Sequence, residues 1–341
     1  MIKRPSLAFF LFLAAPAVLT AWDETGHRMV NQLALASLPP DFPAWVHEAA
    51  NADRIAFLAG EPDRWRNSHD EPFLGYNGMD HYLDMELLTD AGIDLATLTP
   101  FRYQFAAEYA AGRAAHSDKF PPIDPAKDRD HSHEWPGFLP WAIAEYAAKL
   151  QSEFSYLKTF ERYGTPEEIA EARGNIVYVM GVMGHYVGDG SQPLHATRHH
   201  HGWIGPNPNG YSTRYGIHAW IDGGFIGKAG ITEAEIAPMV VPARPLDVAP
   251  RADGRDAIFV DVFNYLLATQ TFVEPLYQLE KDHKLDDGGP GSREGREFIK
   301  GRLLAGGEML GAIWLTAWRQ AAPDTYLQST LVKRATPAAA P

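Results

Sequence analysis

IVYVMGVMGHYVGDGSQPLH, residues 176–195, closes a predicted helix whose second half is almost wholly apolar. Such a run is typical of a buried helix, and the proline at position 193 marks its end. His185 and Asp189 are four residues apart, so they lie on one face of that helix, one turn from each other. His195 follows on the turn just beyond it. Three side chains of the kind that bind metal ions therefore stand where the sequence otherwise predicts a dry core.

The rest of the chain is also predicted to be mainly helical. Helical periodicity recurs in seven segments, whereas no segment shows the sustained alternation and hairpin turns of a large sheet. Three long stretches lack this periodicity, and loops of such length inside a compact domain are usually functional or disordered. We predict a single all-α domain with long active-site loops. The predicted helices are 26–38, 42–58 with an interruption, 101–115, 136–160, 166–189, 257–279 and 293–322, and the loops are 61–80, 121–135 and 196–216.

The composition limits the chemistry. The chain has 341 residues, 45% of them hydrophobic, and it contains no cysteine. A chain of this length can bury a sizeable core without staples. The lack of cysteine excludes disulfides, thiolate nucleophiles and thiolate metal sites. Any metal ion must therefore be held by histidine, carboxylate or main-chain atoms.

The first 21 residues, MIKRPSLAFFLFLAAPAVLTA, have the pattern of a secretory signal peptide. Their apolar run of 13 residues is shorter than the roughly 20 that a membrane anchor needs. We expect cleavage after Ala21, which makes Trp22 the first mature residue, leaves no stable membrane span and predicts a secreted or periplasmic protein. A domain of residues 22–334 then remains, with a disordered low-complexity tail at 335–341.

The acidic charge excludes one mode of binding. The formal net charge is −13, and such a surface does not attract nucleic acid by bulk electrostatics. Removal of the signal peptide leaves 28 basic residues against 43 acidic ones, or −15. A nucleic-acid substrate would have to be recognised in a local site, where bound divalent ions offset several of the acidic charges.

A second histidine–aspartate pair, His218 and Asp222, repeats the spacing of four. One such pair on a helix is most often only hydrogen-bonded. Two pairs and His195 fall within 38 residues, in apolar surroundings where a charged carboxylate is costly to bury unless a cation compensates it. The spacing alone leaves a metal site and plain hydrogen bonding as open alternatives.

Further motifs upstream carry a resemblance. They are Trp22-Asp-Glu-Thr-Gly-His27, Asp63-Arg-Trp-Arg66 and His81-Tyr-Leu-Asp84. With the later motifs, six separated elements between residues 22 and 226 follow the order of the zinc-dependent single-strand nucleases of fungi, plants and bacteria. The chain resembles this S-one/P-one nuclease family, which shares its helical fold with bacterial zinc-dependent phospholipase C.

The resemblance implies three zinc ions. One would be held by Asp63, His81, His185 and Asp189. A second would be held by the amine and carbonyl of Trp22, by His27 and by Asp189, which would bridge the two ions. The third would be held by His195, His218 and Asp222. Nitrogen and oxygen ligands of this kind suit zinc.

The implied function is hydrolysis of phosphoester bonds in single-stranded DNA or RNA by a monomeric endonuclease, with 3'-nucleotidase activity as a further option. Asp84 is not among the ligands and would orient or deprotonate the attacking water. Arg66 would stabilise charge on the phosphate, or only pair with Asp63. Tyr82 would stack on a base, or only pack in the core.

Two other functions stay open. One is a zinc-dependent phospholipase C acting on phospholipid headgroups, although that branch resembles His-x-x-x-Glu at the last motif, where this chain has Asp222. The other is a non-catalytic metal-binding protein. The 196–216 loop also departs from the glycine- and asparagine-rich stretch of the nucleases, with Gly216 where an asparagine is common.

Histidines and aromatic residues outside these motifs have simpler interpretations. We expect the histidines in two loops to be solvated, namely His131, His133, His199, His200 and His201. The aromatic residues of the 196–216 loop either form a lid or pin the loop to the helices, and they are Trp203, Tyr211 and Tyr215.

Overall fold

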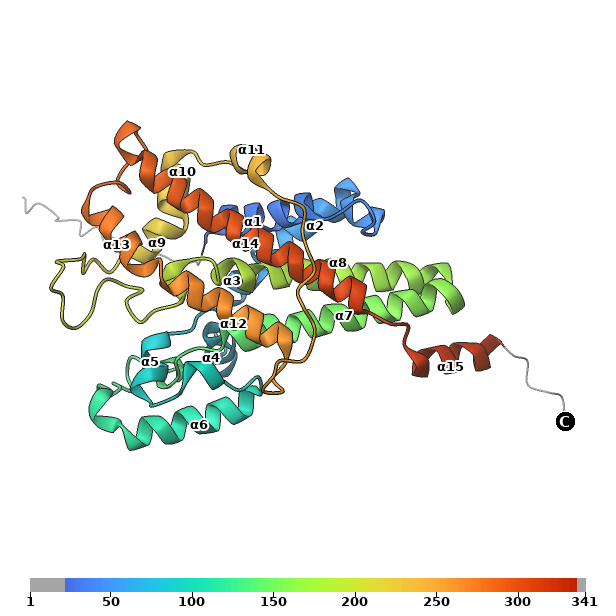
Figure 1. Ribbon diagram of the computed structural model, residues 1–341, viewed down its shortest axis with the longest axis horizontal. Coiled ribbons are helices and arrows are strands. Elements are labelled where there is room, and N and C mark those ends of the chain that lie inside the picture. Colours follow the sequence, from blue (N-terminus) through green and yellow to red (C-terminus); the bar gives the residue numbers. More distant parts are fainter. Residues whose placement is uncertain (1–21, 336–341) are drawn as a thin grey trace, which may run out of the picture.

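The computed structural model describes residues 22–335, which form an all-α domain with no strand in that range (Figure 1). This confirms the predicted fold class. The predicted signal peptide at 1–21 lies outside the described residues, as does the predicted tail except its first residue. Within the described range, no helix combines the length and apolar character that a membrane crossing requires.

Helix α8 (Pro166–Asp189) is the central element, as predicted. Its start is fixed by a capping box, in which the side chain of Thr165 accepts from the backbone N–H of Glu168 and the Glu168 carboxylate accepts in return. From Met180 to Asp189 every side chain is buried. The helix lies against α1 (Glu24–Ser37), α2 (Ala49–Leu58), α7 (Leu139–Tyr163) and α14 (Arg293–Gln320).

Small residues let α1 approach α8 closely. A Cβ atom added at Gly184 would lie 1.6 Å from Oδ1 of Asn31, so no larger residue fits there without rearrangement. The amide of Asn31 donates to the carbonyl oxygens of Ile55 and Gly181, at 2.8 and 3.1 Å. These bonds tie α1, α2 and α8 together, and they bring His27 of α1 against Gly188 near the end of α8.

One predicted loop is wrong. Residues 61–80 contain α3 (Glu61–Trp65) and α4 (Glu71–Met79). Each has a proline in its first turn, where a proline loses no hydrogen bond, and Asp70 caps α4 by accepting from the backbone N–H of Phe73. Both prolines therefore mark helix starts within the predicted loop.

The other predicted helices are present, and two of the predicted segments are each divided into two elements. The segment 42–58 is interrupted as predicted, with a 3-10 turn at Ala44–His47 before α2. The segment 257–279 is two helices, α12 (Ala257–Gln270) and α13 (Val273–Lys281). The remaining α-helices are α5 (Met85–Asp90), α6 (Arg102–Ala115), α9 (Ile217–Ala219), α10 (Phe225–Ala229), α11 (Glu233–Ile236) and α15 (Thr325–Ala335).

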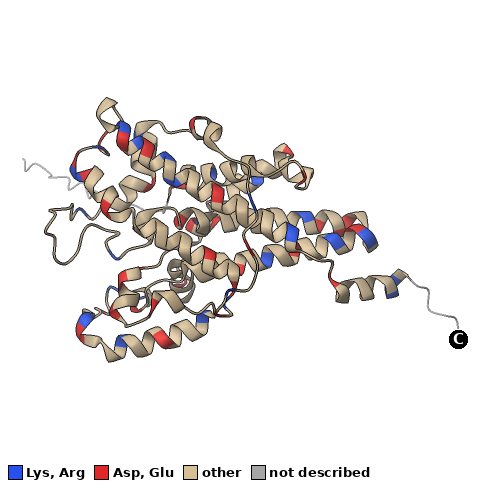
Figure 2. Ribbon diagram, in the orientation of Figure 1, with Lys and Arg blue, Asp and Glu red and all other residues tan. Residues whose placement is uncertain are grey.

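Short helical turns punctuate the connections. A π-helical turn, Trp220–Gly224, joins α9 to α10. The 3-10 turns after Ala44–His47 are Leu95–Thr97, Ser117–Lys119, Ser132–Glu134, Pro193–His195, Ala237–Met239 and Pro290–Ser292. Charged residues of both signs lie along the outer ends of α7 and α8 (Figure 2), so the acidic excess is not concentrated there.

Candidate metal centre

The C-terminal turn of α8 presents His185 and Asp189 to a buried space. The His185 ring lies with Nδ1 2.7 Å from the carbonyl oxygen of Ala59, so Nδ1 is the protonated nitrogen and Nε2 is free to accept. That Nε2 lies 2.9 Å from Nδ1 of His81 and 3.3 Å from Oδ2 of Asp189. The ligand-type atoms of these three side chains thus converge.

Asp189 faces two groups of ligands at once. Its Oδ2 lies 3.1 Å from Nδ1 of His81, and its Oδ1 lies 3.5 Å from Nε2 of His27. The side chain is fully buried. The two oxygens of this carboxylate therefore face different histidines, while the bridging of two ions that the resemblance implies for Asp189 stays a prediction.

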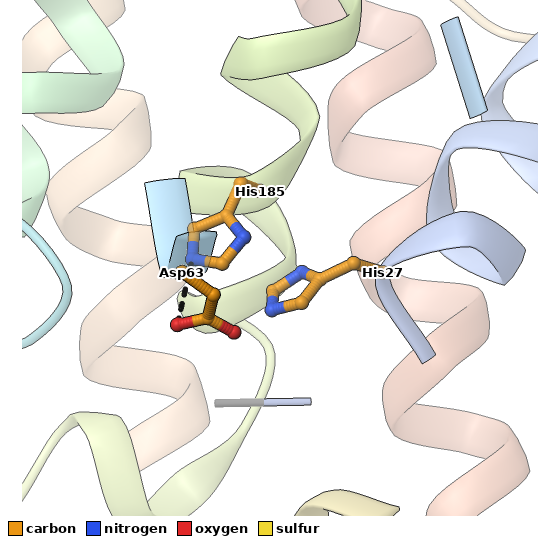
Figure 3. Close-up of side chains that lie close together, drawn as sticks. All are labelled: His27, Asp63 and His185. Carbon is orange, nitrogen blue, oxygen red and sulfur yellow. Dashed lines mark ion pairs between the residues drawn. The ribbon is translucent and has the colours of Figure 1, made fainter. Parts of the chain in front are cut away.

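Asp63 approaches from α3. Its Oδ1 lies 3.9 Å from Nε2 of His185 and 3.4 Å from Nη1 of Arg66. Figure 3 shows the side chains of Asp63, His27 and His185 pointing toward one another from three helices. Ligand atoms of these three residues all lie within 4.8 Å of one another, and so do those of His81, His185 and Asp189. The two groups share His185, so they form one continuous centre.

A second cluster contains His195, His218 and Asp222, whose ligand atoms also lie within 4.8 Å of one another. Nδ1 of His195 lies 2.6 Å from the carbonyl oxygen of His81 and therefore donates to it. The accepting Nε2 of His195 then lies 3.0 Å from Nε2 of His218, which is 3.2 Å from Oδ2 of Asp222. Two imidazole nitrogens that face each other beside a carboxylate favour a shared cation.

Trp22 lies close to both the centre around Asp189 and the second cluster of His195, His218 and Asp222. Its indole N–H lies 2.9 Å from the carbonyl oxygen of Gly188 and 3.2 Å from Oγ of Ser191. The next residue, Asp23, donates its backbone N–H to the carbonyl oxygen of Asp222 at 3.1 Å. Trp22 is therefore fixed beside ligands of both groups, while the role of its amine stays a prediction.

Burial disfavours the charged form of each of these side chains. It raises the pKa of Asp189 and Asp222 well above the usual value, and that of Asp63 to about 7. It lowers the pKa of His195 to about 3. It also lowers the pKa well below the usual value for His27, His81, His185 and His218. The imidazoles are therefore unprotonated, which is the form that binds metal.

Several buried atoms have no hydrogen-bond partner among the described residues. They include both ring nitrogens of His27, Oδ1 of Asp189 and Oδ2 of Asp222. Orphaned polar atoms in a core are costly, and a divalent cation would satisfy them together. The buried histidine and aspartate groups therefore suit metal binding.

A cleft of about 630 Å³ opens onto this centre, with His81, His195 and His218 in its lining. Although the chain is acidic, this cleft is not. Its carboxylates are Asp84, Asp124 and Asp222, and its cationic side chains are Arg66, Arg113, Lys119, Lys127 and Arg198. An anionic ligand would meet more positive than negative groups here.

The three residues predicted to act on substrate all line the cleft. Arg66 contacts Asp63 and also faces the cleft, so its two predicted roles are compatible. Tyr82 lies in the wall rather than in the core. Asp84 is buried, and its Oδ1 has no hydrogen-bond partner among the described residues. Its backbone N–H donates to Pro136 at 2.7 Å, which fixes its position.

The prediction of solvated histidines is wrong for the triplet. His199 is buried and its ring stacks on that of Trp203, at 4.0 Å between centroids. His200 and His201 are half-buried and line the cleft, and Nδ1 of His200 lies 3.6 Å from Oδ1 of Asp84. The aromatic residue four positions after His199 was the signal that could have indicated a packed loop.

Aromatic residues pin this loop to the helices. Trp203 packs edge-on against Tyr277 of α13, at 5.4 Å between ring centroids. The hydroxyl of Tyr211 lies 3.1 Å from Oε2 of Glu274. Of the two interpretations of these aromatics, pinning therefore holds for Trp203 and Tyr211. Tyr215 is mostly exposed.

His131 and His133, by contrast, are exposed as predicted.

Comparison with known proteins does not assign the chain to a family, since neither a protein-family model nor a curated sequence matches it.

Proposed function

We propose that this protein is a secreted or periplasmic zinc-dependent phosphodiesterase that cleaves single-stranded nucleic acid. The observation that carries the proposal is the position of Asp189, fully buried with its two oxygens 3.5 and 3.1 Å from the histidines of two different ligand groups. Neutral ligand pairs do not need such an arrangement, whereas two neighbouring cations do. The second cluster opens onto the same cleft, which supports a third ion.

The residues proposed to hold zinc are Trp22, His27, Asp63, His81, His185, Asp189, His195, His218 and Asp222. Zinc bound there would act as a Lewis acid toward a phosphoester and lower the pKa of water. The number of ions and the part played by the amine of Trp22 belong to the proposal. Both can be tested without a substrate.

The chain's own side chains supply the rest. Arg66 is anchored by Asp63 at 3.4 Å and presents its guanidinium to the cleft, where it can donate to phosphate oxygens. Oδ1 of Asp84 makes no hydrogen bond and lies 3.6 Å from Nδ1 of His200 in the same cleft, so it can accept a proton from a water molecule or orient it. Tyr82 offers a ring in the wall for stacking against a base.

The lining of the cleft supports a nucleic-acid substrate. Its excess of arginine and lysine side chains suits a chain of phosphates. Its aromatic residues include Tyr109, Phe120 and Trp135, which suit unpaired bases because every base has a face that can stack. A paired duplex hides those faces, so we propose a preference for single strands, by a monomeric enzyme.

The test uses mature protein that begins at Trp22 and is loaded with zinc. We expect degradation of denatured DNA or RNA, slower cleavage of duplex DNA and loss of activity with chelator. Release of phosphocholine from phosphatidylcholine vesicles without nucleic-acid cleavage would reassign the protein as a phospholipase C. Bound zinc without turnover of either substrate would leave a metal-binding protein and reject the proposal.

Mass spectrometry of the secreted protein provides an independent check. We expect an N-terminus at Trp22 and three zinc ions per chain by metal analysis. A mature chain with one extra residue before Trp22 should lose one of these ions, because the nitrogen of Trp22 would then belong to a peptide bond and could no longer act as an amine ligand. Retention of all three ions would show that the amine is not a ligand.

A further inference from the structure

A separate group of ligand-type side chains lies in the connection between α6 and α7, which forms one wall of the cleft. Asp128, His131 and Glu134 place one ligand atom each within 4.8 Å of one another. None of the three belongs to the buried centre. Two carboxylates and an imidazole are a donor set that a divalent cation can use.

Asp128 is the unusual member. Only 3% of its surface is exposed. Its Oδ1 accepts from the backbone N–H of His133 at 2.9 Å, while its Oδ2 is buried and has no hydrogen-bond partner among the described residues. Lys127 pairs with Asp124 and Arg129 with Glu71. The exposed ring of His133 has its Nδ1 3.9 Å from Oδ1 of Asp128, which leaves Oδ2 without a partner. A buried carboxylate in this situation lacks the compensation that such groups normally have.

His131 and Glu134 complete the group from its exposed side. Nδ1 of His131 lies 2.9 Å from Oε1 of Glu134. The backbone of His131 has a φ of +56°, a left-handed conformation that costs a non-glycine residue about 1 kcal/mol. The position of Glu134 is held by Arg113, whose Nη1 donates to its carbonyl oxygen at 3.0 Å. The chain thus keeps His131 against Glu134 although its conformation is unfavourable.

The same chain contains a natural comparison. His283 also has a left-handed backbone, with a φ of +59°, and its Nδ1 lies 2.9 Å from Oδ2 of Asp286, again three residues later. No third ligand atom joins that pair within 4.8 Å among the described residues. What distinguishes the first group is the buried carboxylate of Asp128, whose Oδ2 has no hydrogen-bond partner among the described residues.

We propose that Asp128, His131 and Glu134 bind a divalent transition-metal cation such as zinc, in a site separate from the buried centre. The cation would supply the missing partner of Asp128 and replace the direct contact between His131 and Glu134. Solvent would complete its coordination, as at sites with three protein ligands. The site joins residues that are three and six positions apart, so a bound ion closes the loop on itself.

A cation bound at this site would order one wall of the cleft. Ser132 and His133, which lie between the proposed ligands, line the cleft, and so does Trp135 directly after them. A bound cation would hold these residues in place by fixing the loop from 128 to 134. The proposal concerns metal binding and local order, so it does not depend on the reaction that the cleft supports.

The experiment measures zinc bound per chain after equilibrium dialysis of the mature protein against buffers of set free zinc. Two variants remove one ligand each, His131→Gln and Glu134→Gln, and both positions are exposed enough to spare the fold. His283→Gln is the matched control. We expect each ligand variant to bind one zinc fewer than the wild type at free zinc that saturates the loop site, and the control to bind the wild-type number.

A second readout is hydrogen exchange of the segment 124–135. Added zinc should slow exchange there in the wild type and in His283→Gln, but not in His131→Gln. Equal zinc content in the wild type and both ligand variants would overturn the proposal, as would equal loss in the control. Because the comparison is a difference between variants, it holds whatever number of ions the buried centre binds.

Discussion

Replacing Asp63 with asparagine tests the strain that the metal centre places on the ion-free protein. The side chain of Asp63 is only 8% exposed, and burial raises its pKa from the usual 3.8 to about 7 although Arg66 opposes the shift. Asparagine has nearly the same shape and no charge. The substitution therefore removes the ionisation and leaves the packing.

The magnitude follows from that pKa. The unfolded chain releases the Asp63 proton near pH 3.8, while the folded protein keeps it until about pH 7. The contribution of this group to stability is complete below the lower value and is lost as the pH rises through the upper one. At about 1.4 kcal/mol per pKa unit, a shift of about three units makes the ion-free wild type less stable than Asp63→Asn by about 4 kcal/mol at pH 8. Near pH 4 the two proteins should be equally stable.

The assay is urea unfolding in excess chelator at pH 4 and pH 8, followed by circular dichroism. Asp53→Asn, at an exposed position of α2, controls for the loss of a surface carboxylate. The zinc affinity of Asp63→Asn should be lower than that of the wild type although its ion-free stability is higher, since the substitution removes a proposed ligand. A stability difference that is the same at both pH values would show that Asp63 is not strained by burial, and the reasoning would fail.

Three further substitutions test the scaffold and the cleft. Gly184→Ala should destabilise the fold by about 1–3 kcal/mol through overpacking against α1, whereas Gly174→Ala on the same helix, where nothing lies within 4 Å, should be neutral or stabilising in the same urea experiment. Thr165→Ala removes the cap of α8 and should lower the free energy of unfolding by about 1 kcal/mol. Arg66→Ala should lower kcat about 10²–10³-fold on the single-stranded nucleic acid proposed as substrate. Arg64→Ala loses contacts with Glu61, Glu24 and Phe57 but none in the cleft lining, so it should leave kcat unchanged.

Much of the fold could be predicted because its helices carry strong local signals. The apolar run before His185 predicts a buried helix, and the spacing of four between His185 and Asp189 places both on one face of it. That this pair meets His27 and His81 could not be derived from periodicity, because those contacts join residues 104 to 162 positions apart. The order of motifs supplied that expectation, and the close packing at Gly184 explains it physically.

The errors arose where a local signal has two meanings. Residues 61–80 lack a clear helical period, which predicts a loop, yet the prolines at 62 and 72 each open a short helix. The triplet of histidines from His199 reads as solvated, yet Trp203 stacks on the first of them and the other two face the cleft. The excess of cationic side chains in the cleft could not be predicted from the sequence either, because the net charge of a chain does not show how its charges are distributed over the surface.

The cleft has walls and a floor of different origin. Its floor is the cage of histidines and aspartates at the end of α8, whereas the walls come from two connections, before α7 and after His195. The proposed zinc ligands of the buried centre are absent from both connections. Exchanging either wall for a segment of different shape or charge should therefore alter which ligands enter the cleft without disturbing the buried histidines and aspartates, so the selectivity of the cleft can be changed separately from the proposed metal centre.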